Sequence, residues 1–243
     1  MGVDLINQQR ASTTVSEAAF AREFLSIYTS ENDDSWFNFD QLLRHRKIVN
    51  AEWSAKRIDP EKQYYLISCD VGRFNDQTEV FVFKVSQRPD GKLRSQIVNI
   101  YTLGKTAKDK QFSVQTLHLK KIIKAFNPRE VVIDTNGNGV GIADELIRTQ
   151  VDLHGEEYGP IGFRNDDHYS KIQPKDAPKI AYSFKASSSI NSEMYGIIYS
   201  RINAGLVDFC IKEQDARGKL LSTKKGQKRG LEERTRLLMP YEA

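Results

Sequence analysis

Two short apolar runs, each ending in an aspartate, are the feature that most limits what this chain can fold into. The first is Tyr64–Val71, YYLISCDV, and the second is Glu130–Asp134, EVVID. Runs of this length, rich in β-branched residues and stopped by Gly or Asn, predict buried strands. Functional groups of α/β sheets gather at the carboxyl ends of such strands. Asp70 and Asp134 are therefore predicted to share one edge of a sheet.

The segments around these runs predict a mixed α/β order. Strands are expected over 78–85 and 95–103, with a Pro89-Asp90-Gly91 turn between them, followed by a helix over 113–126. After the second aspartate run we expect a helix over 141–149, a polar loop over 155–180 with a short strand near 160–163, a helix over 188–204 and a strand over 206–211. This order matches a ribonuclease H-like mixed sheet of three antiparallel strands plus parallel strands, flanked by helices.

The chain of 243 residues is long enough for one large domain with an appendage. Residues 1–60 are predicted to be a helical connector. Its first helix begins at Ser16, and Trp36 and Phe37 are docking aromatics. Residues 61–243 are predicted to form the main domain.

Composition limits the class of protein further. The net charge of +4 mildly favours a polyanionic partner. The sequence has no run of about 18 apolar residues and no signal-peptide pattern, so we expect neither a membrane protein nor a secreted one. Cys69 and Cys210 are predicted to be buried free thiols. There is no Gly-rich loop ending in Lys-Ser or Lys-Thr, the usual cradle for ATP phosphates.

Several stretches, taken in order, resemble the nuclease domain of tailed-phage terminase large subunits. They are SEAAFAREFLSIYTSENDDSWFNFDQL, ISCDVGRFNDQTEVFVF, VVIDTNGNGVGIADEL and FKASSSINSEMYGIIYSRINAGLVDF. Each stretch alone is weak, but their order and spacing are fairly specific and run from Ser16 to Glu242. The resemblance implies a metal-dependent endonuclease that cuts concatemeric double-stranded DNA during viral packaging.

The resemblance also implies partners and a setting. Terminases work with an ATPase domain, a small terminase subunit and a portal protein, at the procapsid in the host cytoplasm. Two features of the family are not in this sequence. The ATPase domain is absent, and the family's third acidic residue, on a late helix, is expected beyond Ala243. We therefore expect the nuclease domain to be C-terminally truncated.

Phosphodiester hydrolysis is chemistry that paired carboxylates support. Two Mg²⁺ or Mn²⁺ ions about 3.5–4 Å apart activate a water and stabilise the leaving oxyanion. Asp70 is predicted to bridge both ions and Asp134 to hold one of them, which makes both residues catalytic. The alternative for each is an aspartate that only caps a strand end or a turn.

Other acidic residues are weaker candidates. Asp76 is expected either to support the metal ligands without binding the metal or only to stabilise its hairpin. Asp208 is the in-chain candidate for a third metal ligand, although its alternating strand suits a solvent-facing aspartate equally well. Asp166, Asp167 and His168 either approach the site from a loop or belong to a solvated surface.

Two basic clusters are candidates for contact with DNA phosphates, and a solvated surface is the alternative for both. The first cluster is Lys171, Lys175, Lys179 and Lys185; the second is Lys224, Lys225, Lys228 and Arg229. No recognition helix or zinc module predicts base-specific reading.

The leading hypothesis is a metal-dependent endonuclease domain of a packaging terminase. A different ribonuclease H-like nuclease, such as a junction resolvase, is the second enzymatic interpretation. The contrasting interpretation is a catalytically incomplete fragment that binds DNA or the portal protein but does not cut.

Overall fold

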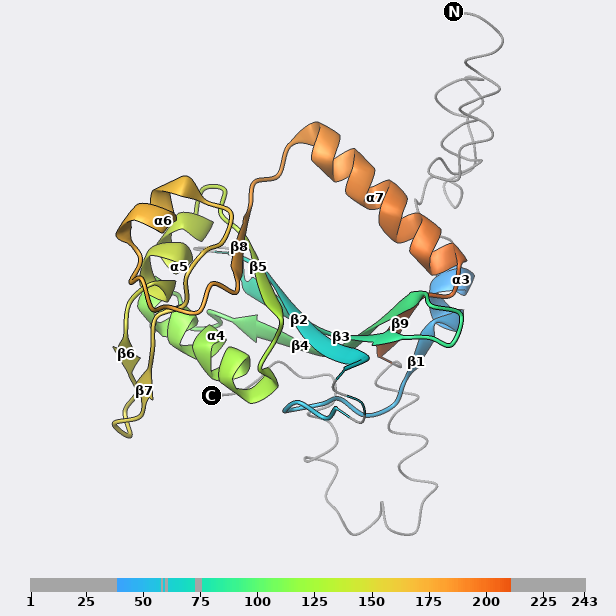
Figure 1. Cartoon of the computed structure of the whole chain (residues 1–243), viewed down its shortest axis with the longest axis horizontal. Helices are drawn as coiled ribbons and strands as arrows, with labels where there is room; N and C mark the ends of the chain where they lie inside the picture. Colours follow the sequence, from blue (N-terminus) through green and yellow to red (C-terminus); the bar gives the residue numbers. More distant parts are fainter. Residues whose placement is uncertain (1–38, 58, 60, 73–75, 211–243) are drawn as a thin grey trace, which may run out of the picture. The chain divides into compact units, whose positions relative to one another are not determined.

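The structure is a computed structural model that describes residues 39–57, 59, 61–72 and 76–210 (Figure 1). These residues divide into two compact units. The smaller contains residues 39–46 and 186–207, and the larger contains the described residues of 47–185 together with 208–210. The predicted connector helix at Ser16, Trp36 and Phe37 lie outside the described residues. The expected domain boundary near residue 60 remains a prediction.

The smaller unit contains two helices, α3 (Phe39–Arg44) and α7 (Ser188–Asn203). Ser187 begins α7, because its side chain accepts a hydrogen bond from the Ile190 N–H at 3.4 Å. Gly205 follows the helix at a positive φ of 67°, where glycine is favoured. The predicted helix over 188–204 is confirmed to within one residue.

A seven-stranded mixed sheet forms the centre of the larger unit. Its order is β1-β9-β4-β3-β2-β5-β8. The strands are β1 (Arg46–Ile48), β2 (Gln63–Asp70), β3 (Thr78–Gln87), β4 (Leu93–Leu103), β5 (Glu130–Asp134), β8 (Ala181–Phe184) and β9 (Val207–Cys210). β2, β3 and β4 form an antiparallel meander, while β5 and β8 extend the sheet in parallel with β2. The ribonuclease H-like layout, with the two aspartate strands side by side, is confirmed.

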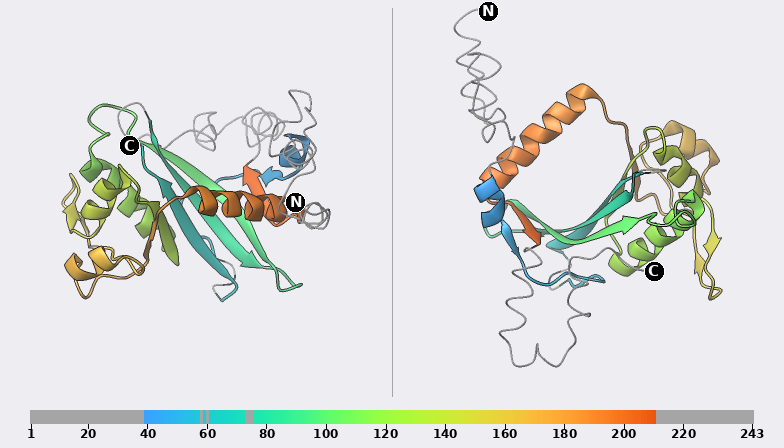
Figure 2. Two further views of the ribbon diagram at one scale, coloured as in Figure 1. Left: turned by 90° about the horizontal axis from the view of Figure 1, so that it is seen from above. Right: turned by 180° about the vertical axis from the view of Figure 1, so that it is seen from behind.

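One face of this sheet packs against α4 (Phe112–Phe126) and α5 (Gly139–Leu146), as Figures 1 and 2 show. Alternate residues of β2, among them Ile67 and Cys69, are buried in that core with Leu119 and Phe126 of α4. Successive side chains of a strand point to opposite faces. Asp70 and Asp134 therefore lie on the face away from the helix-covered core.

The region 155–180 is more structured than the predicted loop. It contains β7 (Glu157–Tyr158), which pairs with β6 (Gln150–Val151), and α6 (Asp167–Ile172). The strand expected near 160–163 is reduced to a bridge between Phe163 and Ala181. β8 was not predicted, because four residues of ordinary polarity carry little periodicity.

Helix α4 buries polar side chains as well as apolar ones. Ile122, Ile123 and Phe126 are buried, but the apolar Val114 and Leu117 are only half-buried. Their inward places are taken by Gln115, Thr116 and Lys120. The Lys120 ammonium donates a hydrogen bond to the Arg148 carbonyl just beyond α5. Within the described residues, no helix is long and apolar enough to cross a membrane.

Lys120 gives the stability of the larger unit a pH dependence that can be measured. Burial lowers the pKa of Lys120 from 10.5 to about 8. Between these two values the unfolded chain binds a proton that the folded chain has lost, so stability from this group rises with pH. The free energy of unfolding of the wild type should therefore rise relative to Lys120→Met from pH 8 to pH 10.5, as measured by urea denaturation.

The exposed Lys124→Met on the same helix is the matched control. Its unfolding curve should follow the wild type across this pH range. A constant difference between the wild type and Lys120→Met from pH 7 to pH 10.5 would contradict the burial of a charged lysine.

Candidate metal site

The parallel register of β2 and β5 brings the two predicted aspartates together. Cys69 is level with Ile133, so Asp70 and Asp134, one residue further along, are neighbours on the same face. Both residues end their strands. The structure thus places Asp70 and Asp134 side by side at the carboxyl edge of the parallel strands, as the sequence predicted.

The turn after Asp134 is fixed by short-range contacts. The Asn136 N–H donates to the Asp134 carboxylate at 2.9 Å, and the Thr135 N–H donates to the Phe184 carbonyl at 2.9 Å. Gly139 begins α5 so close to the strand that a Cβ there would lie 1.7 Å from the Asp134 carbonyl oxygen. Only glycine fits this approach, which holds the helix against the aspartate.

The chain after Asp70 is held by a buried polar network. The Gly72 N–H donates to the Thr78 hydroxyl at 3.0 Å, and that hydroxyl donates to the Gln115 side chain from α4. A Cβ on Gly72 would lie 2.4 Å from the Gln77 carbonyl oxygen. Asp76 is exposed in this hairpin, and its supporting role remains a prediction.

Cys69 precedes Asp70 but is not available as a metal ligand. Burial, with the neighbouring charge of Asp70, raises the pKa of the Cys69 thiol to about 12. The thiolate, which is the form that binds metals, is therefore disfavoured at neutral pH. Cys69 and Cys210 form no disulfide with each other; Cys69 is buried as predicted, while Cys210 is half-buried and donates a hydrogen bond to the Ile97 carbonyl.

Glu79 is a third acidic residue at this edge that the sequence reasoning missed. It lies directly opposite Asp70 in the antiparallel ladder. Its carboxylate accepts a hydrogen bond from the Thr102 hydroxyl, at 2.8 and 3.0 Å to its two oxygens. The sequence did contain a signal for it, because the alternation of apolar and polar residues along 78–85 puts Glu79 on the face opposite Val80. Like charges opposite each other destabilise a sheet, so this edge attracts a cation.

The donor set of the aspartate pair suits a hard divalent cation. Among the described residues, the Asp70 carboxylate makes no hydrogen bond or ion pair, and that of Asp134 accepts only from the Asn136 N–H. Their remaining carboxylate oxygens can therefore coordinate a metal ion. No group of three or more His, Cys, Asp or Glu in the described part of the chain is arranged to hold a metal. Two carboxylates with water suffice for Mg²⁺, which keeps several waters in proteins.

Asp208 lies far from this pair. It is fully buried on β9, where it forms ion pairs with Arg94 and, at 3.8 Å, with Lys47. Arg94 is level with Ser86, whereas Thr102 is level with Glu79, so β4 separates the two groups by about 25 Å at about 3.3 Å per residue. The structure corrects the prediction of Asp208 as a third metal ligand: its charge is committed to Arg94.

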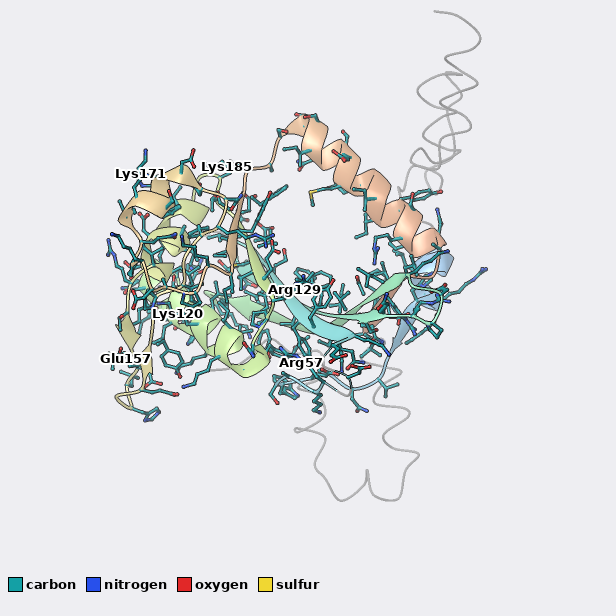
Figure 3. All side chains as sticks on the ribbon, viewed as in Figure 1. Arg57, Lys120, Arg129, Glu157, Lys171 and Lys185 are labelled. Carbon is teal, nitrogen blue, oxygen red and sulfur yellow. The ribbon has the colours of Figure 1, made fainter. Side chains whose placement is uncertain are left out.

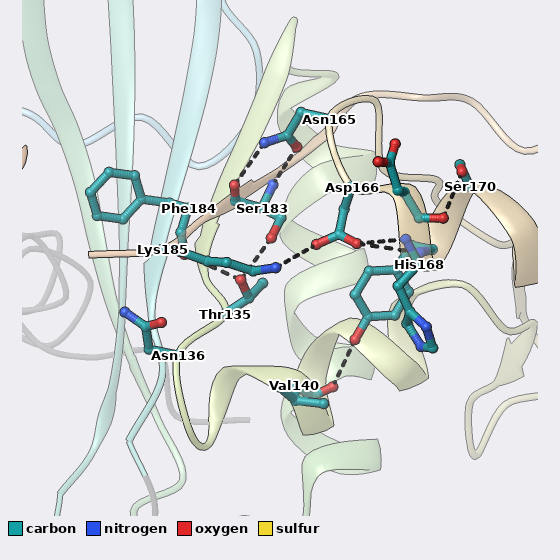
Figure 4. Close-up of polar contacts among 12 residues, drawn as sticks. Thr135, Asn136, Val140, Asn165, Asp166, His168, Ser170, Ser183, Phe184 and Lys185 are labelled. Carbon is teal, nitrogen blue, oxygen red and sulfur yellow. Dashed lines mark hydrogen bonds and ion pairs between the residues drawn. The ribbon is translucent and has the colours of Figure 1, made fainter. Parts of the chain in front are cut away.

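Asp166 and Asp167 belong to the start of α6 (Figure 4). Asp166 caps this helix by accepting from the backbone N–H groups of His168 at 3.0 Å and Tyr169 at 3.4 Å. Burial acts to raise the pKa of Asp166, but the ion pair with Lys185 and hydrogen bonds from Ser183, Tyr169 and His168 outweigh it and lower that pKa. Asp166 is therefore a charged, fully engaged carboxylate.

The first predicted basic cluster is distributed over the α6 region and β8. Lys171 lies on α6, and Lys185 follows directly after β8 (Figure 3). Lys175 and Lys179 are exposed between these elements. The second cluster, Lys224, Lys225, Lys228 and Arg229, lies outside the described residues.

Comparison with solved structures finds nucleases to which this chain is similar. The large terminase nuclease of the thermophilic phage G20c with bound magnesium aligns at 18% identity and a TM-score of 0.47, over 77% of this chain and 79% of that one. The human cytomegalovirus terminase nuclease domain aligns at 11% identity and a TM-score of 0.35, over 76% and 80% of the two chains. The chain is therefore similar in structure to terminase nuclease domains.

A yeast mitochondrial Holliday junction resolvase is also similar. It aligns at 14% identity and a TM-score of 0.32, over 78% of this chain and 81% of that one. No protein-family model matches the chain, and no curated protein matches its sequence.

The close approach of Gly139 to Asp134 predicts the effect of one added methyl group. Gly139→Ala should lower the free energy of unfolding by about 1–3 kcal/mol, because backbone has to move to admit the Cβ. Urea denaturation measures this loss. Gly159→Ala is the control, since nothing lies within 4 Å of a Cβ there; equal stability of the two variants would contradict the packing.

The opposition of Asp70 and Glu79 predicts a second stability effect, of opposite sign. In metal-free buffer with EDTA, Asp70→Asn should raise the free energy of unfolding by about 0.2–1 kcal/mol, because it removes a like-charge cross-strand pair. Thermal unfolding at low salt measures it. Asp90→Asn, in the exposed turn at the other end of β3, should give no such gain, and a loss of stability in Asp70→Asn would refute the repulsion.

Proposed function

We propose that this chain is a metal-dependent endonuclease domain of a viral DNA-packaging terminase, hydrolysing phosphodiester bonds of concatemeric double-stranded DNA. The observation that carries the proposal is the Asp70–Asp134 pair, side by side at the carboxyl edge of two parallel strands. Such an edge is where α/β sheets place their functional groups. The sequence resemblance to terminase nucleases supports the choice of substrate.

Bound Mg²⁺ or Mn²⁺ would supply an activated water and stabilise the leaving oxyanion. Asp70 and Asp134, side by side on neighbouring strands, would hold these ions, and Glu79 on the other neighbouring strand adds negative charge beside Asp70. Asp134 is suited to hold one ion, with its side chain oriented by the Asn136 N–H. The Thr78–Gln115 network keeps the chain after Asp70 in place while the substrate binds.

The DNA partner is proposed from charge. Phosphate neutralisation by Lys and Arg gives affinity without sequence preference. Lys171, Lys175 and Lys179 are exposed and are assigned to this role, together with the basic cluster from Lys224 to Arg229. An ATPase domain, a small terminase subunit and a portal protein complete the proposed assembly, which acts in the host cytoplasm.

A catalytically incomplete DNA-binding or portal-binding fragment is the second candidate. It is favoured by one observation: the described residues do not assemble three metal ligands of the His, Cys, Asp or Glu type. Both candidates bind DNA. Only the nuclease hypothesis requires that a variant that loses metal binding also loses DNA cleavage.

The deciding experiment is a Mn²⁺ titration by calorimetry with a plasmid-nicking assay on the same 243-residue chain. Loss of a residue that only orients a metal ligand typically costs about 10- to 100-fold, so loss of the ligand itself should cost at least about 100-fold. Asp70→Asn and Asp134→Asn should each lose nicking by at least this factor, together with Mn²⁺ binding.

Asp90→Asn is the matched control and should bind Mn²⁺ and nick as the wild type does. Mn²⁺ binding without nicking in the wild type would favour the incomplete fragment. Plasmid nicking by both aspartate variants would refute the assignment of Asp70 and Asp134 as the metal site.

A further inference from the structure

The loop between β4 and α4, residues 104–111, lies at the same end of the sheet as the aspartate pair, and it is here called the basic loop. Thr102, near the end of β4, is level with Glu79, which in turn is level with Asp70. Thr102 is therefore two strands from Asp70, or about 10 Å at about 4.8 Å per strand. The chain thus enters the basic loop beside the carboxylate edge.

The basic loop carries more positive than negative charge. Its sequence, GKTAKDKQ, contains Lys105, Lys108 and Lys110 and one acidic residue, Asp109. The Asp109 carboxylate accepts a hydrogen bond from the Thr106 hydroxyl of the same loop. Lys105 and Lys108 are exposed, and neither forms an ion pair with another described residue. Their two ammonium groups are therefore available to an anionic ligand.

One buried side chain connects the basic loop to the chain that follows Asp70. The Gln115 side chain of α4 donates to the Lys110 carbonyl at 3.1 Å and accepts from the Thr78 hydroxyl. That hydroxyl also accepts from the N–H of Gly72, two residues after Asp70, at 3.0 Å. Gln115 is only 1% exposed, so these hydrogen bonds are shielded from water. The basic loop is thereby held in place relative to Asp70.

The turn within the basic loop is also defined by hydrogen bonds. The Asp109 N–H donates to the Thr106 hydroxyl at 3.3 Å, and the Lys110 N–H donates to the Thr106 carbonyl at 3.1 Å. Gly104 begins the loop at a positive φ of 73°, where glycine is favoured. The lysines are therefore presented by a loop with a defined backbone.

Fold stability does not account for this concentration of lysines. Cations near the start of a helix are unfavourable, because the helix dipole places partial positive charge there. Lys108 and Lys110 come within four residues of Phe112, where α4 begins, and the first turn of α4 contains no acidic residue. Asp109 offsets only part of this charge. A polyanion bound at the basic loop would offset the rest.

We propose that Lys105 and Lys108 bind backbone phosphates of a DNA duplex whose cleaved phosphate lies at the Asp70–Asp134 edge. The inference rests on the proposed nuclease function and adds the path of the duplex past the site. A duplex carries about one negative charge per 1.7 Å of its axis, so DNA bound at the edge presents further phosphates at the distance of the basic loop. The contact is electrostatic and carries no sequence preference, and no bond forms or breaks at either lysine.

The main test is the double variant Lys105→Met/Lys108→Met in the full chain. In EDTA, anisotropy of a short labelled duplex should show the slope of log affinity against log salt reduced by about 2, because two phosphate contacts are lost. The reduction should be the same for two duplexes of unrelated sequence. A wild-type slope in the double variant would overturn the proposal.

Lys62→Met/Lys92→Met is the charge-matched control. Both lysines are exposed at the opposite end of the sheet, directly before the starts of β2 and β4, and their removal changes the net charge equally. This variant should keep the wild-type slope. An equal reduction in the two double variants would show that only net charge matters and would overturn the contact.

Lys105→Arg/Lys108→Arg tests whether charge is what the DNA recognises. The guanidinium groups retain the positive charge, so the salt slope should stay near that of the wild type. A slope as low as that of the methionine variant would refute an electrostatic contact.

Nicking kinetics separate a DNA contact from a disturbance of the metal site. In Lys105→Met/Lys108→Met, KM for DNA at 0.1 M salt should rise by at least about 10-fold while kcat stays near wild type, because the lysines bind substrate and transition state alike. Mn²⁺ affinity by calorimetry should be unchanged. A lower kcat at unchanged KM, or loss of Mn²⁺ binding, would show that the substitutions act through the Gln115 network and would refute the direct contact.

The proposal and the nuclease function fail in different ways. If the wild type nicks and the methionine variant keeps its duplex affinity and salt slope, the nuclease stands and the basic loop is not a DNA contact. If the wild type does not nick, the slope in EDTA still decides: a reduction by about 2 assigns the basic loop to DNA binding in a protein that does not cut, and an unchanged slope removes it. If the wild type binds no duplex, both proposals fall.

Discussion

The parallel pairing of β2 with β5 is the interaction on which the rest of the larger unit depends. It sets Cys69 level with Ile133, and with them the two aspartates that follow. A register shift of one residue would turn one carboxylate into the helix-covered core, where an unpaired charge is very costly. The buried alternation of both strands therefore fixes the geometry of the edge as firmly as it fixes the core.

The support for this edge comes from residues that do not belong to it. Gln115 reaches from α4 to Thr78 and the chain after Asp70, and Gly139 lets α5 begin against the Asp134 carbonyl. Gln115 acts through a hydrogen bond, and Gly139 acts because it has no Cβ. The carboxylates themselves keep oxygens without a hydrogen-bond partner among the described residues, and their like charges repel each other. The rigid contacts therefore surround the pair, and the electrostatic strain lies within it.

The sequence was sufficient for the elements with strong periodicity and for the aspartate pair. It was not sufficient where the structure of a segment depends on residues that are distant in the sequence. β8 and α6 are too short to show a period, and Gln115 and Lys120 look solvent-facing until their buried partners are known. Asp208 shows the same limit: alternation cannot separate an aspartate facing solvent from one buried against Arg94. Glu79 was missed because its importance depends on which strand lies opposite.

The long separation between paired strands also affects how the chain folds. Leu66 pairs with Glu130, and Val131 pairs with Ala181, so each parallel neighbour joins the sheet only after a large loop has closed. The antiparallel meander of β2, β3 and β4 is local and can form first. During synthesis from the N-terminus, a nascent chain therefore has Asp70 long before it has Asp134. The carboxylate edge is assembled late, on a sheet that already exists.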